Sequence, residues 1–268
     1  MESFEFIKPS PVLASYIKHY WILDVNNLSV VTERVIPTGF SQLVFHRGQR
    51  MFSSSKGDLQ PQSFICGQSV GFSDLQSTGR VNMIVVVFQP FGARAVFGIP
   101  MNEFHNTDIA VDCLGEPSLS ELEDKICNTE DNQSAIGMIE QFLISRLYSF
   151  NNHYNLKRIS GVIGAINKQN QINITSLSDI ACLSYKQFTR IFTEYVGSSP
   201  KEFSRVIRFQ RALYILQNNP HINIVELAVE SGYYDQPHLI REFKLFSGYT
   251  PKEFLAICNP YSDYFTIV

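Results

Sequence analysis

The chain has 268 residues, of which 44% are hydrophobic, and a formal net charge of −3. This length accommodates two domains, and the hydrophobic content is ordinary for a globular protein. No run of about 18 apolar residues occurs, so we expect no membrane-spanning helix and no membrane partner. The opening residues, MESFEFIKPSP, include acidic residues and lack an apolar core, so we expect no secretory signal.

Charge is divided unevenly along the chain. Residues 1–150 carry 10 Lys and Arg against 16 Asp and Glu, whereas residues 151–268 carry 12 against 9. A basic C-terminal part is typical of a nucleic-acid-binding domain attached to a domain with another role. The five cysteines are scattered and include no Cys-x-x-Cys pair. We therefore expect reduced, small buried thiols in a cytoplasmic protein.

In chain order, residues 9–20 are predicted to form a short helix, with Ser10 as its cap and Pro11 in its first turn. From about residue 21 to 111, short β-rich segments alternate with Pro and Gly breakers, which predicts an antiparallel β domain. A short helix is expected from Ala93 to Phe97. The expected strands lie within residues 30–36, 41–47, 63–67 and 81–88, the last of them in the core.

Aromatic side chains are frequent in this β-rich region. They would line a pocket or fill a core equally well, so the sequence leaves a ligand site open. The residues concerned are Tyr20, Trp21, Phe40, Phe45, Phe64 and Phe88.

Two amphipathic helices are predicted next, at 117–128 and 133–149, and Ser118 with Glu121 resembles a capping box for the first. An apolar stripe on the second helix would pack against its own β domain or form a dimer seam. The polar stretch 150–155 is the expected linker, and a helix at 156–168 follows.

The C-terminal part contains an internal duplication. Residues Ile172–Ile174 and Leu177 recur 50 positions later, and SPKEF at 199–203 recurs as TPKEF 51 positions later. The change of offset implies one extra residue in the turn of the second copy. Two copies are too few for a solenoid, so we predict two helix-turn-helix units in tandem.

Caps and a turn support this prediction. In the first copy, Asn173 and Ser184 are predicted to cap the two helices, with Gln187 completing a capping box. In the second copy, Asp235 is predicted to cap the second helix and Gly232 to take positive φ in the turn. The buried faces of the helices would leave polar faces toward solvent.

The duplicated segment resembles the DNA-binding domain of the AraC/XylS family of transcription regulators, over about residues 155–258. The resemblance rests on ELAVESGYYDQPHLIREFK and SGYTPKEF, and on the first copy, SLSDIACLSYKQFTRIFTEYVGSSPKEF. Ser178 and Cys182 depart from the family pattern, which usually has Ala and often Gly there. A looser resemblance over IPTGFSQLVFH, FICGQ and FQPFGARAVFGIPMNEFHNTDI connects the N-terminal part with the sensory half of one subgroup whose ligand is unassigned.

The resemblance implies an α+β chain of two domains. Residues 1–150 are expected to form an antiparallel, cupin-like β-barrel domain with flanking helices, which senses a small molecule or mediates dimerisation. Residues 151–268 are expected to form an all-α DNA-binding domain, with helix-turn-helix units at about 172–196 and 222–247. Two recognition helices would then enter successive major grooves, about 34 Å apart.

Candidate DNA contacts lie on the outward faces of the two recognition helices. Arg can hold guanine with two hydrogen bonds, and an apolar side chain can touch a thymine methyl group. A solvated helix face is the alternative for each residue. The candidates are Lys186, Gln187, Thr189, Arg190, Gln236, His238, Ile240 and Arg241. For Arg208, on the intervening helix, we favour pairing within the domain, for instance with Glu194 or Glu202, over contact with phosphate.

Other functions lack the residues that they require. His19, His46 and His105 are isolated, and no Walker, Gly-x-Ser-x-Gly or Gly-x-Gly-x-x-Gly motif occurs, so we expect neither an enzyme nor a cofactor. We predict a cytoplasmic bacterial transcription regulator that binds double-stranded DNA. A small-molecule effector, RNA polymerase and a second copy are further candidate partners. The alternative is a protein-interaction module of the same fold that does not bind DNA.

Overall fold

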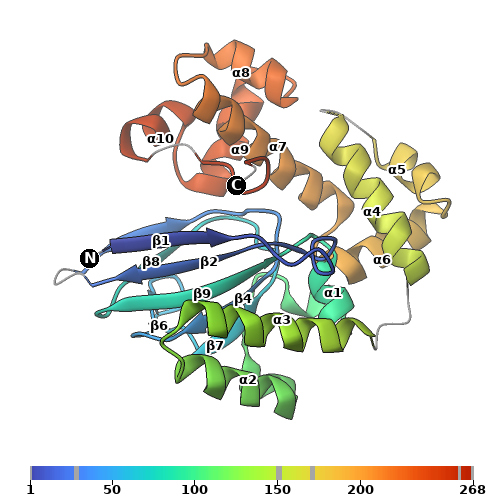
Figure 1. Ribbon diagram of the computed structural model, residues 1–268. Coiled ribbons are helices and arrows are strands. Elements are labelled where there is room, and N and C mark those ends of the chain that lie inside the picture. The colour runs from blue at the N-terminus through green and yellow to red at the C-terminus, as the bar shows by residue number, and fades with distance from the viewer. Residues whose placement is uncertain (1, 27–29, 149–152, 170–172, 259–260, 267–268) are drawn as a thin grey trace.

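A computed structural model describes residues 2–26, 30–148, 153–169, 173–258 and 261–266. An N-terminal part of antiparallel strands, with helices on one side, lies beneath an all-helical C-terminal part (Figure 1). The predicted α+β class, an antiparallel β domain followed by an all-helical one, is therefore confirmed, although the described strands form two sheets and not one closed barrel.

The strands form two antiparallel sheets. The six-stranded sheet has the order β1 (Glu2–Ile7), β2 (Ile17–Val25), β9 (Val81–Phe88), β4 (Gln42–His46), β7 (Ser63–Cys66) and β10 (Asp108–Ala110). The four-stranded sheet has the order β3 (Thr32–Val35), β8 (Ser73–Gln76), β5 (Phe52–Ser53) and β6 (Asp58–Leu59). The four strands predicted from sequence are β3, β4, β7 and β9.

Strand β9 is almost continuously apolar because it lies inside the six-stranded sheet and is covered on both faces. Ile84 and Val86 pack with the helices of the N-terminal part, whereas Met83 and Val85 face the other core. A strand that is buried on both faces has no side that requires polar residues.

The helix predicted at residues 9–20 is wrong. Residues 11–16 form turns, and Ile17 already belongs to β2, which pairs with β1 and β9. Ile17 and Tyr20 are both fully buried in the sheet. Pairing with two neighbouring strands overrides the local helical pattern.

The helices of the N-terminal part are α1 (Gly92–Phe97), η1 (Met101–Phe104), η2 (Val111–Leu114), α2 (Pro117–Cys127) and α3 (Asn132–Tyr148). The capping box at Ser118 is wrong, because Glu116 is the N-cap of α2 and Pro117 begins the helix. The stripe of α3 is buried against its own domain through Ile139 and Leu143. That stripe is therefore not a dimer seam.

The helices of the C-terminal part are α4 (His153–Lys168), α5 (Ile174–Ile180), α6 (Tyr185–Val196), α7 (Pro200–Asn218), α8 (Ile224–Ser231), α9 (Gln236–Ser247) and α10 (Pro251–Ile257). Of the expected linker, residues 150–152 lie outside the described residues and residues 153–155 already belong to α4.

The two parts share one hydrophobic core. Val87 of β9 lies in the same cluster as Phe192 of α6 and Phe203 of α7. The segment that follows α10 contributes Tyr264, whose ring stacks on Phe40 with centroids 4.8 Å apart. The N-terminal part therefore supports the helical part through buried apolar contact, which fixes how the helix pairs are presented.

Candidate nucleic-acid interface

The first helix pair is built by local caps. The Asn173 side chain accepts a hydrogen bond from the Ser176 amide at 2.7 Å, at the start of α5. Ser184 and Gln187 form the predicted capping box at the start of α6. Between the helices, Cys182 has φ 51 and so adopts the left-handed conformation that Gly favours. The turn forms without Gly at this position.

The second pair repeats this geometry with one more residue. Gly232 has φ 87, and the Asp235 side chain accepts from the His238 amide at 2.8 Å. Leu183 and Tyr233 make equivalent backbone bonds to positions 178 and 228, so the inserted residue is Tyr234. Its side chain is 87% exposed beside the start of α9. Sequence reasoning found the insertion and missed this aromatic group; the GYYD run was its only signal.

The SPKEF and TPKEF motifs form the N-terminal caps of helices. Ser199 and Glu202 form a capping box at the start of α7, and Thr250 and Glu253 form one at the start of α10. Pro occupies the first helical position in both, where its missing N–H is harmless. These repeated motifs fix the helices that follow each recognition helix.

The predicted contact residues on α6 differ in whether their side chains already have partners within the protein. Lys186 and Arg190 are exposed and have no ion pair within the described residues. The Gln187 side chain is occupied in the capping box, and the Thr189 hydroxyl donates to the Tyr185 carbonyl at 3.0 Å. Lys186 and Arg190 are therefore the side chains of this helix with charged groups available to a ligand.

On α9, Arg241 is exposed, Gln236 and Ile240 are half-buried, and His238 is bound into the domain. The His238 Nε2 atom lies 3.5 Å from the Glu242 carboxylate, and its ring meets Tyr233 edge-on with centroids 5.1 Å apart. A base contact from His238 would have to compete with these neighbours.

Glu242 anchors α9 to α7. This buried carboxylate accepts a hydrogen bond from Arg205 at 2.6 Å and lies 3.7 Å from the Arg208 guanidinium. The prediction that Arg208 pairs within the domain is confirmed, although its partner is Glu242. Glu194 and Glu202, the partners suggested from sequence, bond Arg94 and the Ser199 amide instead.

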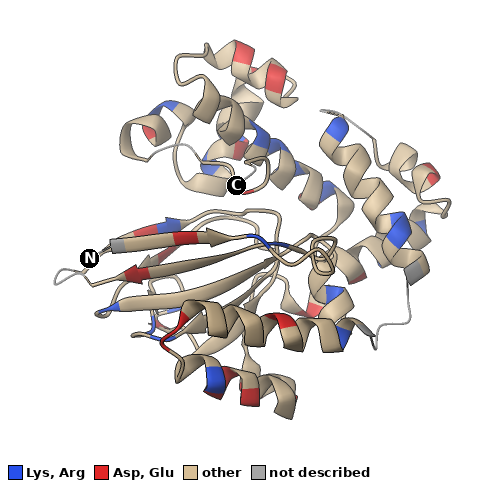
Figure 2. Ribbon diagram, in the orientation of Figure 1, with Lys and Arg blue, Asp and Glu red and all other residues tan. Residues whose placement is uncertain are grey.

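Basic residues are frequent along α7 and its neighbours, as Figure 2 shows. Arg211, also on α7, donates to the Asn167 carbonyl at 2.9 Å. Together with Arg205 and Arg208, it has partners inside the protein. The basic face of α7 therefore serves mainly to join helices.

The N-terminal part flanks the first recognition helix. A groove of about 630 Å³ has Lys186 and Arg190 of α6 on one side and Asn102 and Glu103 of η1 on the other. Arg94 of α1 also pairs with Glu194 of α6, at 2.9 Å. Helices η1 and α1 therefore contact α6 directly, and a displacement of either would change the surroundings of α6.

Among the described residues, no three His, Cys, Asp or Glu side chains gather as metal ligands would. No described helix combines the length and the apolar character needed to cross a bilayer.

Two family models match the chain. A helix-turn-helix domain model matches residues 177–257, and a domain of unknown function, DUF6597, matches residues 5–110. An uncharacterized HTH-type transcriptional regulator of Haemophilus influenzae is 30% identical over 100 residues, which are 37% of this chain and 33% of that protein. The arabinose operon regulatory protein of Escherichia coli is 24% identical over 156 residues, 54% of this chain and 53% of that protein.

Among solved structures, ToxT from Vibrio cholerae aligns with 96% of this chain and 99% of its own, at 11% identity and a TM-score of 0.46. The matched stretches span about a third to about half of the curated relatives named above. The two capped, turn-joined helix pairs define a tandem helix-turn-helix protein. The C-terminal part therefore contains a helix-turn-helix domain and is similar to transcription regulators that include the arabinose operon regulatory protein.

Proposed function

We propose that the chain is a sequence-specific, DNA-binding transcription regulator that acts in the bacterial cytoplasm. Helices α6 and α9 read successive major grooves of double-stranded DNA with residues of the predicted set. The N-terminal part biases this binding in response to a small molecule or to dimerisation. The shared core and the contact of η1 with α6 support such a bias, because they join the two parts closely.

One observation carries the proposal. Arg190 and Arg241 are 51 positions apart, so they occupy the same place in the two copies. Both are exposed and neither has an ion pair within the described part of the chain. In contrast, Arg205, Arg208 and Arg211 of the same domain are all engaged internally. An unpaired Arg at one repeated position of two recognition helices suits bidentate contact with guanine.

The test is a selection of genomic DNA fragments with the purified chain. We expect a bipartite motif with two elements about one helical turn, 34 Å, apart. Arg190→Ala should relax one element and Arg241→Ala the other, each at a cost of about 1–3 kcal/mol at the affected base pair. Lys252→Ala, which removes an exposed charge from α10, is the matched control and should leave both elements sharp.

Two results would contradict direct reading of DNA. One is a lack of enrichment at low salt with folded protein. The other is a motif that neither Arg variant alters. A steep loss of affinity with rising salt is expected, because phosphate contacts release counterions. Salt-independent behaviour would instead favour a protein-interaction module.

A further inference from the structure

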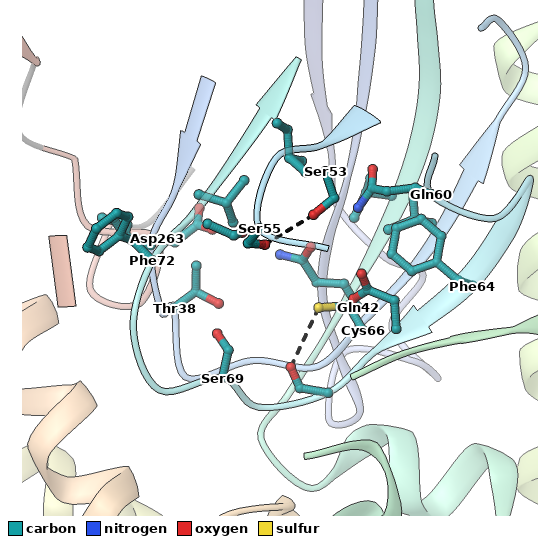
Figure 3. A pocket seen from close by; sticks show the side chains of 18 of the residues that line it. Thr38, Gln42, Ser53, Ser55, Gln60, Phe64, Cys66, Ser69, Phe72 and Asp263 are labelled. Atoms are coloured by element: carbon teal, nitrogen blue, oxygen red, sulfur yellow. Dashed lines mark hydrogen bonds between the residues drawn. The ribbon is translucent and has the colours of Figure 1, made fainter. Parts of the chain in front are cut away.

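A cavity of about 640 Å³ lies between the two sheets (Figure 3). Both sheets form its wall, with Trp21 and Val85 from one and Leu75 from the other. This volume is within the range of small-molecule sites, about 300–1,000 Å³. Of the aromatic residues considered from sequence, Trp21 and Phe64 line this cavity. Tyr20, Phe45 and Phe88 fill the core beneath the helices, and Phe40 stacks on Tyr264.

The end of the described chain supplies the remaining wall. Tyr261 and Asp263 line the cavity although they follow the whole DNA-binding domain in sequence. Figure 3 shows Asp263 beside Thr38 and Phe72, with Phe64 on the opposite side. The site is therefore made by both parts of the protein.

The charged side chains that line the cavity differ in whether they have an ion-pair partner. Lys56 and Asp108 pair with each other at 2.7 Å, which leaves them neutral as a pair. Asp263 has no ion pair among the described residues, because the Lys18 ammonium donates to the backbone carbonyls of Asp263 and Tyr264, at 2.5 and 2.6 Å. Burial raises the pKa of the Asp263 carboxyl, and the charge of Lys18 opposes that shift. The cavity thus holds one carboxyl group that lacks a direct counter-charge and that burial shifts toward its neutral form.

We propose that this cavity binds a small molecule that has a cationic nitrogen on an apolar body, with the Asp263 carboxylate as its counter-charge. The ammonium–carboxylate hydrogen bond is of the strong, charge-assisted kind. Aromatic side chains such as those of Trp21 and Phe64 attract a cation and also bury its apolar body. A ligand with a carboxylate would find no counter-charge at Asp263.

Occupancy of the site would reach the DNA-binding helices through the C-terminal segment, a step that rests on the proposed function. Ser262, next to Asp263, donates to the Gln210 side chain of α7 at 3.1 Å. Gln210 is fully buried and donates to the Pro37 carbonyl at 2.7 Å, beside the cavity residue Thr38. Since α7 connects the two helix-turn-helix units, a ligand that fixes Asp263 also constrains their spacing.

The test is a calorimetric titration of the full chain without DNA, at neutral pH. Three probes share one body and differ in their head group: 4-phenylbutylamine, 4-phenylbutanol and 4-phenylbutanoate. We expect the amine to bind about tenfold more tightly than the alcohol, and the carboxylate to bind most weakly. Asp263→Asn should weaken the amine about tenfold and leave the alcohol unchanged. Asp112→Asn, which alters an exposed carboxylate outside the cavity, is the control.

A second variant tests the location. Leu75→Trp places a larger side chain on the cavity wall and should weaken the amine and the alcohol together. Several outcomes would overturn the proposal: no probe binds, the carboxylate binds as well as the amine, or neither variant changes affinity although circular dichroism shows it folded. Because no DNA is present, a failure to find an operator leaves this result intact.

Discussion

Replacing Cys182 by Gly tests how the first turn is held. Cys182 is exposed and has φ 51, whereas the equivalent Gly232 has φ 87. A side chain with a Cβ atom costs about 1–2 kcal/mol in the left-handed region. Gly loses about 0.5–1 kcal/mol more backbone entropy on folding. The difference predicts that Cys182→Gly raises the free energy of unfolding by about 0.5–1 kcal/mol.

Urea and thermal denaturation, followed by circular dichroism, measure this effect. The expected rise in Tm is about 1–4 °C for a chain of this size. Cys182→Ala is the matched control, since it removes the thiol and keeps the Cβ atom, and it should change stability little. In the second copy, Gly232→Ala should lower stability by about 0.5–1 kcal/mol, because the strain that it introduces is partly offset by the smaller loss of backbone entropy on folding.

The reasoning fails if Cys182→Gly is no more stable than Cys182→Ala. That result would mean that the turn is held by contacts that compensate for the backbone strain. A gain shared equally by both variants would point to the thiol rather than to φ.

Three other perturbations probe the contacts that hold the helices in place. Glu242→Ala should lower the free energy of unfolding by about 2–3 kcal/mol in urea, because it leaves Arg205 without its partner, although partial exposure of the arginine softens the loss. Glu242→Gln should cost less, and equal losses would argue against a role for the charge. Arg94→Ala should lower stability by about 1 kcal/mol, since its pair with Glu194 is partly buried; an unchanged Tm would show that this pair does not join the two parts. Burial lowers the pKa of His46 to about 4, so the unfolded chain takes up its proton first as the pH falls, and about 3 kcal/mol of stability should be lost between pH 6.5 and 4. His46→Leu should flatten the stability profile over that range, and an unaltered slope would exclude His46 as its cause.

Local chemistry explains why the C-terminal part was predictable from sequence. Caps such as Ser184 and Asp235, and the apolar spacing of Leu239 and Phe243, act within one or two helical turns. Each of these features appears in the structure where the sequence indicates it. The eight proposed DNA contacts are placed on α6 and α9, but their contact with DNA stays a prediction.

Long-range packing explains what could not be predicted. Strand β2 replaces the expected helix because β1 and β9 pair with it, and no local pattern announces that pairing. The cysteines show the same limit, since Cys113 and Cys182 are exposed rather than buried. The use of Asp263 as a cavity wall depends on how the end of the chain returns to the first domain.

The single inserted residue, Tyr234, makes the two reading units unequal. If α6 and α9 read DNA as proposed, one unit has the exposed Tyr234 in the turn before its helix, whereas the other has the exposed Tyr185 in the helix itself. The protein would then bind its operator in one defined orientation along the duplex. Inverting the operator within a promoter would turn the N-terminal part to face the opposite direction along the duplex. The orientation of the site, and not only its sequence, would therefore decide which side of the promoter the regulator addresses.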